Sequence, residues 1–239
     1  GCAGQGSNFA EALFQKIDGV ANRRKRAAPL QLRQPQRRRR LVAGRCGLRP
    51  GCIAVGASTG GILGIQQFLS ALPDQIDCPI LITQHLPASF IPHFVRQLAA
   101  RVRQSVEVGE PGKVIMPNHI YIAPGEGHLG CKRDGSRVRT IRIDGEFAAH
   151  YTPAVDPMLS SAATVFGPAA VGIVLSGMGL DGLEGARDLR AHGGTTIVQD
   201  QESSVVWGMP GGIAKAGLAD AIMRPSEMGT YLWERSQAA

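Results

Sequence analysis

The sequence predicts a doubly wound α/β domain on a mainly parallel sheet, and two observations carry this prediction. From residue 51 onward, short apolar runs alternate with segments of helical periodicity, which is the strand–helix rhythm of a parallel sheet. A separate stretch, 128–147, alternates charged and apolar residues around Asp134-Gly135, a pattern that favours an exposed antiparallel hairpin. The 239 residues, 44% of them hydrophobic, suffice for one domain or at most two.

The expected strands are short apolar runs, most of them flanked by glycine, proline or polar turn residues. They cover 52–55, 79–83, 120–123, 169–175, 195–198 and 221–223. The intervening segments carry apolar residues three or four positions apart, as one face of a helix requires. Ile62, Ile65 and Leu69 define the first such segment, and Leu72-Pro73 ends it. The expected helices cover 62–69, 90–98, 158–165, 183–191 and 213–216.

Residues 1–50 carry the positive charge of the chain. They hold twelve Lys or Arg against Glu11 and Asp18, a net +10, which leaves −3 for the rest of the +7 total. The run Arg37–Arg40 is consistent with nucleic-acid contact or with a solvated, flexible linker. The linker is favoured, because the body lacks a basic face with interleaved aromatic residues.

The same fifty residues divide into two parts. Phe9, Leu13 and Ile17 recur every four residues, which indicates one short amphipathic helix within 8–20. Residues 21–50 are rich in Arg, Gln and Pro without an apolar period, and we expect them to form a linker. The missing initiator Met indicates a fragment of a longer protein or a cloning remnant.

Cysteine usage and hydropathy indicate the cellular compartment in which the protein works. The five cysteines are scattered and form no C-x-x-C pair, which favours a reducing cytosol over a disulfide framework: Cys2, Cys46, Cys52, Cys78 and Cys131. No apolar run reaches the roughly 18 residues of a membrane helix, so no membrane insertion is expected. His119, His128 and Cys131 lack regular ligand spacing, and we expect neither a metal nor a cofactor.

Ligands of open α/β sheets bind beyond the carboxyl ends of the strands, and three such ends carry polar side chains. The first is the segment G-A-S-T-G-G at 56–61, where Ser58 lies on the turn from strand to helix. Its glycines permit a tight turn, and the helix N-terminus supplies unpaired N–H groups. Three interpretations stay open here: a phosphate site, a serine nucleophile, or Ser58 or Thr59 as the helix N-cap.

The second end is Thr83-Gln84-His85, where the histidine directly follows an apolar run. A lone histidine is more often a hydrogen-bonded structural residue than a catalytic one. A place on the next strand, at the same edge of the sheet as Ser58, shifts the balance toward catalysis.

The third end is Ser176 to Gly182, which satisfies G-x-G-x-x-G with Asp200 closing the next strand. This pattern raises a rival hypothesis, a nucleotide-binding module that uses Gly177–Gly182 as a dinucleotide fingerprint. Two features weaken it: Asp181 would place a carboxylate beside the pyrophosphate, and the motif follows a late strand rather than the first.

Together the three ends supply a serine, a histidine and an aspartate in chain order. A hydroxyl needs a base to become a nucleophile, and the base needs a carboxylate to fix its tautomer. This predicts Ser58, His85 and Asp181 as a catalytic triad, with the backbone N–H group of Thr59, of Met178 or of both as the oxyanion donor. For Met178, plain side-chain packing is an equally good interpretation.

Six motifs in one order carry a family resemblance: GASTGG (56–61), TQHLPASF (83–90), YIAPGEGH (121–128), VDPMLSSAA (155–163), LSGMGLDGLEGA (175–186) and QDQESSVVWGMP (199–210). The body from about Cys52 to Met228 resembles the catalytic domain of the CheB-type protein-glutamate methylesterase/deamidases. Leu86, Ala154 and Leu183 depart mildly from the family pattern, and none belongs to the triad. The resemblance implies a Rossmann-like methylesterase catalytic domain over 51–239, preceded by the linker of 1–50.

The resemblance also implies a function in chemotactic adaptation. It implies a cytoplasmic serine hydrolase that demethylates glutamate γ-methyl esters, and deamidates glutamines, on the cytoplasmic helices of bacterial chemoreceptors. Members usually carry an N-terminal receiver domain, phosphorylated by a histidine kinase, that covers the active-site cleft until phosphorylation displaces it. We expect residues 1–50 to be the connecting linker, without the receiver domain. Two alternatives remain besides the enzyme, namely the nucleotide-binding module and a receptor-docking protein with a degenerate site.

Overall fold

The computed structural model describes residues 49–145 and 151–237. The expected helix within 8–20, the linker of 21–50 and the Arg37–Arg40 run lie outside the described residues, except for the last two linker positions. The division of the chain at residue 50 therefore stays a prediction.

A sheet of seven parallel strands forms the centre of the body, in the order β3-β4-β2-β1-β7-β8-β9. The strands are β1 (Cys52–Ala57), β2 (Ile80–Gln84), β3 (Ser105–Val108), β4 (His119–Ile122), β7 (Ala170–Val174), β8 (Thr195–Gln199) and β9 (Ala221–Met223). The central strand β1 pairs with β2 on one side and with β7 on the other, so Val55 lies between Ile82 and Ile173. The strand order reverses at this point, and such a reversal opens a crevice beyond the carboxyl ends of β1 and β7.

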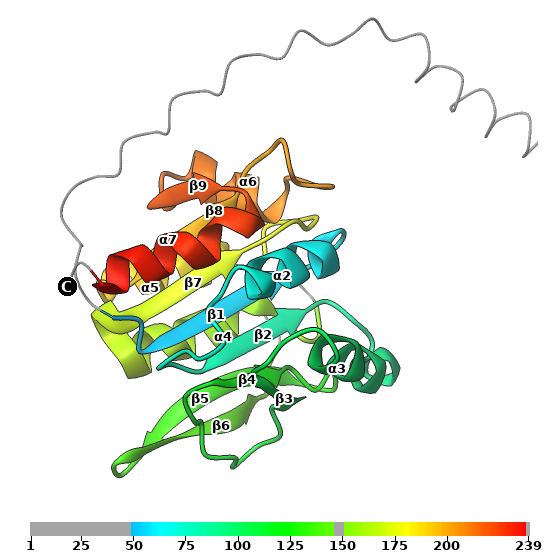
Figure 1. The fold of residues 1–239 in the computed structure, drawn as a ribbon, viewed down its shortest axis with the longest axis vertical. Coiled ribbons are helices and arrows are strands. Elements are labelled where there is room, and N and C mark those ends of the chain that lie inside the picture. Colours follow the sequence, from blue (N-terminus) through cyan, green and yellow to red (C-terminus); the bar gives the residue numbers. More distant parts are fainter. Residues whose placement is uncertain (1–48, 146–150, 238–239) are drawn as a thin grey trace, which may run out of the picture. The chain divides into compact units, whose positions relative to one another are not determined.

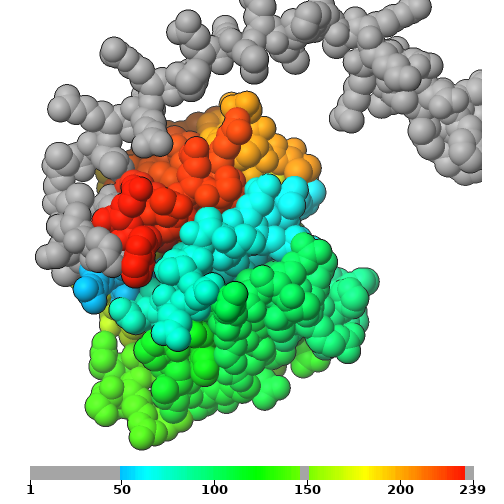
Figure 2. Space-filling model, viewed as in Figure 1, coloured from blue at the N-terminus to red at the C-terminus, as the bar shows by residue number. Residues whose placement is uncertain are grey.

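Helices cover both faces of the sheet, as the doubly wound prediction requires (Figure 1). One face carries α2 (Gly61–Ser70), α3 (Ile91–Ala99) and α7 (Pro225–Gln237), and the other carries α4 (Val155–Phe166), α5 (Leu183–Ala191) and α6 (Met209–Lys215). Two short 3₁₀ turns, η1 (Ala88–Phe90) and η2 (Gly167–Ala169), connect elements. Figure 2 shows α2, in cyan, directly beside α7, in red. Their close approach depends on Gly229, where a Cβ atom would lie 2.5 Å from the backbone of Ala71.

The two helical layers bury two separate hydrophobic clusters against the sheet. Phe68 of α2 and Phe94 of α3 pack on one face, with Met228 of α7. Met158 of α4 and Ile213 of α6 pack on the other. Because β1, β2 and β7 are buried on both faces, they read in the sequence as continuous apolar runs.

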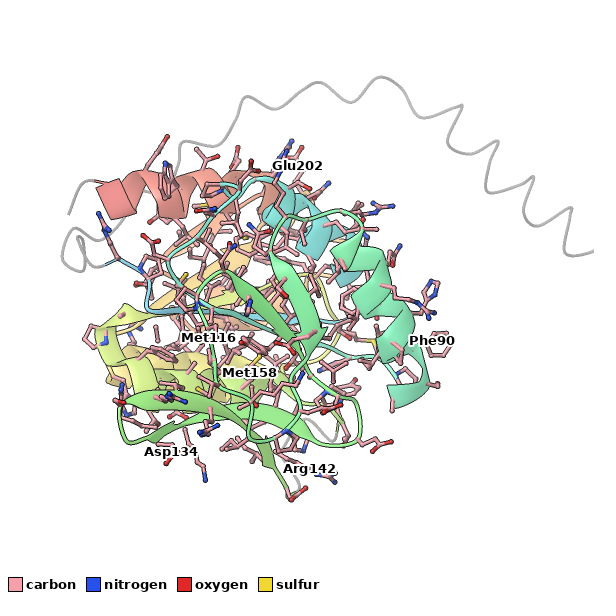
Figure 3. The ribbon with its side chains drawn as sticks, turned by 60° about the horizontal axis from the view of Figure 1, so that its bottom comes forward. Phe90, Met116, Asp134, Arg142, Met158 and Glu202 are labelled. Carbon is pink, nitrogen blue, oxygen red and sulfur yellow. The ribbon has the colours of Figure 1, made fainter. Side chains whose placement is uncertain are left out.

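The hairpin was predicted as an exposed element, but the inner half of its first strand is buried. β5 (His128–Asp134) pairs antiparallel with β6 (Arg137–Ile143), and Asp134 and Arg142 mark its solvent-facing parts (Figure 3). The inner half of β5 is buried under α4, where Leu129 is fully buried and the N–H of Cys131 donates to Ser161 Oγ at 3.1 Å. The hairpin thus covers one end of the α4 layer.

All expected elements of the body are present, most of them with shifted ends, and the strand β3 and the helix α7 lay outside the prediction. β3 is an edge strand of four residues with no buried side chain, so its apolar signal is weak. The helix α7 begins at Pro225, and its mixed polar sequence gave little periodicity. Across the residues that the structure describes, no helix has the length and apolar character needed to span a bilayer.

Candidate active site

Ser58 lies on the turn that joins β1 to α2, at the reversal point of the sheet. Its N–H donates to the carbonyl of Ser176 at 3.0 Å, and its own carbonyl accepts from Gly61 N–H at 2.9 Å and from Gln84 Nε2 at 3.0 Å. The turn is therefore held by the ends of both neighbouring strands. The N-cap of α2 is Gly60, with φ 80° and no side-chain cap, so the interpretation of Ser58 or Thr59 as the cap is wrong.

Two glycines let other segments approach the turn that carries Ser58. A Cβ atom on Gly60 would lie 2.4 Å from Val205 Cβ, in a backbone conformation that already disfavours other residues. A Cβ atom on Gly177 would lie 2.7 Å from Ser58 Cβ and 2.3 Å from Met209 Sδ. The loop after β7 consequently passes directly over Ser58.

His85 joins the serine to the aspartate. Its Nδ1 lies 3.1 Å from Ser58 Oγ and its Nε2 lies 2.7 Å from Asp181 Oδ2. The imidazole is only 8% exposed and the carboxylate is fully buried. An ionised carboxylate only accepts hydrogen bonds, so Nε2 carries the proton and Nδ1 is free to accept the serine hydroxyl. The structure thus brings together the three side chains that the sequence singled out.

Asp181 is fixed by three donors. Oδ2 accepts from His85 and from Val155 N–H at 2.7 Å, and Oδ1 accepts from Asp156 N–H at 3.0 Å. The last two N–H groups open α4, so the positive end of that helix points at the carboxylate. Burial by itself would raise the pKa of Asp181, but these hydrogen bonds outweigh it and hold that pKa below its ordinary value. The carboxylate therefore stays ionised beside the imidazole.

Tyr151 covers the imidazole and was missed at the sequence level. Its ring stacks on His85 with centroids 4.4 Å apart and planes inclined by 22°. No periodicity marks this residue, since it precedes Thr152-Pro153 in a connecting segment. Tyr151 lies here because the fold brings the segment before α4 next to the end of β2, although the two are far apart in the sequence.

The two predicted oxyanion donors belong to two different segments near Ser58. Thr59 follows it in the turn, and Met178 follows Gly177 in the loop above it. Within the described residues, neither N–H donates to a protein acceptor. The side chain of Met178 is 60% exposed, so the packing interpretation of this residue is wrong.

The geometry gives the nucleotide-binding hypothesis no support. The Asp181 carboxylate occupies the Gly177–Gly182 loop and turns its oxygens toward His85 and α4. Asp200 is a turn residue, with Oδ1 accepting from Ser203 N–H at 2.7 Å. Among residues 49–145 and 151–237, no three His, Cys, Asp or Glu side chains gather as a metal site would require.

Known proteins resemble this chain in sequence and in fold. Residues 53–232 match the family model described as CheB methylesterase. The chain is 41% identical over 189 residues to a protein-glutamate methylesterase/protein-glutamine glutaminase of Maricaulis maris, covering 79% of this chain and 47% of that protein. A protein of the same name from Rhodopseudomonas palustris is 35% identical over 241 residues, covering 94% and 63%.

A solved structure extends the comparison to the fold. The catalytic domain of the Thermotoga maritima CheB methylesterase superposes with a TM-score of 0.73 at 30% identity, covering 78% of this chain and 99% of that one. The chain spans about half the length of most of the curated relatives it matches. With the family model covering most of the body, the chain belongs to the CheB methylesterase family.

Proposed function

We propose that this chain is a serine hydrolase that cleaves glutamate γ-methyl esters on bacterial chemoreceptors, releasing methanol, and that deamidates glutamines of the same receptors. The observation that carries the proposal is His85, whose two ring nitrogens contact Ser58 Oγ and Asp181 Oδ2. The names of the relatives, which state both activities, support it.

In the first half of the reaction, Ser58 Oγ attacks the ester carbonyl and His85 Nδ1 takes the hydroxyl proton. Asp181, which accepts from Nε2, stabilises the imidazolium that forms. The N–H groups of Thr59 and Met178 donate to the developing oxyanion, and the N-terminus of α2 adds a positive potential. The tetrahedral intermediate then collapses to the acyl-enzyme as methanol departs with the proton from His85 Nδ1.

In the second half, a water molecule takes the place of methanol, gives a proton to His85 Nδ1 and attacks the acyl carbon. Collapse returns the proton to Ser58 and leaves a glutamate side chain. A glutamine substrate follows the same course with ammonia as the leaving group.

The surroundings of Ser58 suit a protein substrate. Three large apolar side chains stand exposed around the turn and the loop above it, namely Met178 and Leu180 at 60% and Val205 at 69%. We call these three side chains the apolar rim; exposed apolar surface beside a reactive group is typical of a site that contacts another protein. We propose that this rim receives a cytoplasmic receptor helix, and that the second partner is an N-terminal receiver domain phosphorylated by a histidine kinase.

The test is methanol release from a methylated chemoreceptor by the wild-type chain and by Ser58→Ala. We expect release by the wild type and a loss of at least about a thousandfold in the variant, because no hydroxyl replaces the nucleophile. Ser89→Ala, an exposed serine on η1, serves as the matched control and should stay at the wild-type rate. A folded wild type that releases no methanol, or a Ser58→Ala variant that equals it, contradicts the proposal.

A further inference from the structure

A second buried carboxylate lies next to the candidate triad. Asp156 is 7% exposed and is the second residue of α4, and its N–H is one of the donors that hold Asp181. Its own carboxylate turns to the other helix and accepts from Gly185 N–H at 2.8 Å. Gly185 lies in the first turn of α5, directly after the loop that carries Asp181.

The two aspartates therefore cap each other's helix. The N-terminus of α4 holds Asp181, which precedes α5, and the N-terminus of α5 holds Asp156, which belongs to α4. The helices pack closely at this point, since a Cβ atom on Gly185 would lie 2.5 Å from Leu159 Cβ. Two positive helix ends thus converge on two carboxylates, and any movement of one helix displaces the aspartate of the other.

We propose that Asp156 is a positioning residue for the His85–Asp181 pair, fixing the carboxylate that orients the imidazole and adding a second negative charge behind it. The inference rests on the proposed function. It adds a residue that contacts no substrate and acts through Asp181.

Asp156 and Asp181 also influence each other through their charges. Burial raises the pKa of Asp156 to about 6, with Asp181 repelling the ionised form and Gly185 N–H favouring it. The other titratable groups around it are His85 beyond Asp181, His128 on β5, whose Nδ1 accepts from Ala154 N–H, and the exposed Glu184, paired with Arg187. Above pH 6, Asp156 therefore adds a second negative charge behind Asp181.

The experiment follows the labelling rate of Ser58 by a fluorophosphonate between pH 5 and pH 9. Asp156→Asn keeps an acceptor for Gly185 N–H and an amide that donates to Asp181, so it preserves the caps and removes the charge. Asp220→Asn is the matched control, because Asp220 also accepts one backbone N–H, from Thr196 at 2.8 Å, on the loop before β9. Labelling needs His85 unprotonated, so its pH midpoint reports how tightly the imidazole holds a proton.

We expect the midpoint of Asp156→Asn to lie about half a pH unit or more below that of the wild type, because the imidazolium loses a nearby negative charge. Asp220→Asn should keep the wild-type midpoint. Equal midpoints in the wild type and Asp156→Asn would overturn the inference and leave Asp156 as a helix cap only.

A second readout needs neither labelling nor a folded Asp156→Asn variant. The ¹³Cγ resonance of Asp156 is titrated in the wild type and in His85→Gln, where we expect a higher midpoint because no imidazolium forms. An unchanged midpoint overturns the inference by itself. A wild type that resists labelling while the two titrations differ refutes the proposed function and leaves the coupling of Asp156 to His85 intact.

Discussion

His85 uses both ring nitrogens, and their assignment determines what each neighbour does. Nδ1 faces the serine and Nε2 faces the aspartate, at 3.1 Å and 2.7 Å. Turning the ring by 180° about its bond to Cβ would replace both nitrogens by carbons at these contacts. The orientation of the ring is therefore fixed by its two partners together, and the stacked ring of Tyr151 fixes its plane.

Asp181→Asn tests the role of the carboxylate. An amide that donates to Nε2 would leave the proton on Nδ1, the tautomer that cannot accept from Ser58. We expect kcat for methanol release to fall by about 10³ to 10⁴, as in other Ser-His-Asp triads. Asp200→Asn, which keeps an acceptor for Ser203 N–H in its turn, is the control. A loss of less than about tenfold would make His85 an unassisted base.

Tyr151 gives a second prediction at this scale. Tyr151→Phe keeps the ring over His85, and we expect its kcat to stay within about twofold of the wild type. Tyr151→Ala removes the stacking and admits water to the imidazole, and kcat should fall about three- to tenfold, in line with the worth of an aromatic pair. If the alanine variant is as active as the phenylalanine variant, the stacking plays no part in the reaction.

At the scale of elements, helix N-termini supply the electrostatics of the site. The N-terminus of α2 lies at Ser58, that of α4 holds Asp181 and that of α5 holds Asp156. Only α2 follows its strand by a short turn; α4 and α5 are each preceded by a longer connecting segment. Three separate segments are thus directed at one cluster of charge.

The two carboxylates that accept from helix N-termini, Asp156 and Asp181, predict that the stability of the fold depends on pH. The pKa of Asp156 rises from 3.8 when unfolded to about 6 when folded, so its protonated form stabilises the fold, and this contribution is lost as pH rises through 6. The pKa of Asp181 is lowered, so its contribution is lost only as pH falls below the ordinary range. Asp156→Asn lacks the first effect and shares the second.

Melting temperatures of the wild type and Asp156→Asn, taken at pH 4.5 and pH 7.5, check this prediction. From pH 4.5 to pH 7.5, we expect the melting temperature of the variant to rise by about 2 °C or more relative to that of the wild type. A constant difference across this range would show that Asp156 titrates with an ordinary pKa in the folded protein.

At the scale of the whole molecule, the topology brings together residues that are far apart in the chain. β1, β2 and β7 are adjacent in the sheet, so the segments that follow them meet at one edge although Ser58 and Asp181 are 123 positions apart. This is the reversal point at which open α/β sheets bind their ligands.

Regulation by a second domain is a prediction at this scale. The curated relatives are longer than this chain, which covers 47% to 63% of those described above. We expect an N-terminal receiver domain to lower methanol release by occluding Ser58. A cover worth about 1.4 kcal/mol would reduce the open fraction roughly tenfold, and a phosphodonor should recover most of the loss.

The comparison uses this chain, the two-domain protein, and the two-domain protein with a phosphodonor. A receiver whose phosphate-accepting aspartate is replaced by asparagine is the control, and should stay inhibited when the phosphodonor is added. Equal rates in all samples would contradict regulation by occlusion.

Much of this architecture was predictable because buried parallel strands leave a strong signal. The apolar runs at β1, β2 and β7 end in polar residues, which was enough to single out Ser58, His85 and Asp181. Tyr151 and Asp156 were not assigned to the site, because their roles depend on contacts across segments that no local period records. The edge strand β3 was not predicted, because a strand without buried side chains gives only a weak apolar signal.

The most direct measurement is the mass-spectrometric mapping of a fluorophosphonate adduct on the wild-type chain. The arrangement of Ser58, His85 and Asp181 predicts a single adduct, on Ser58, that is absent in Ser58→Ala and forms far more slowly in Asp181→Asn. An adduct on another residue, or methanol release by a protein whose Ser58 stays unmodified under saturating reagent, would contradict the assignment of Ser58 as the nucleophile.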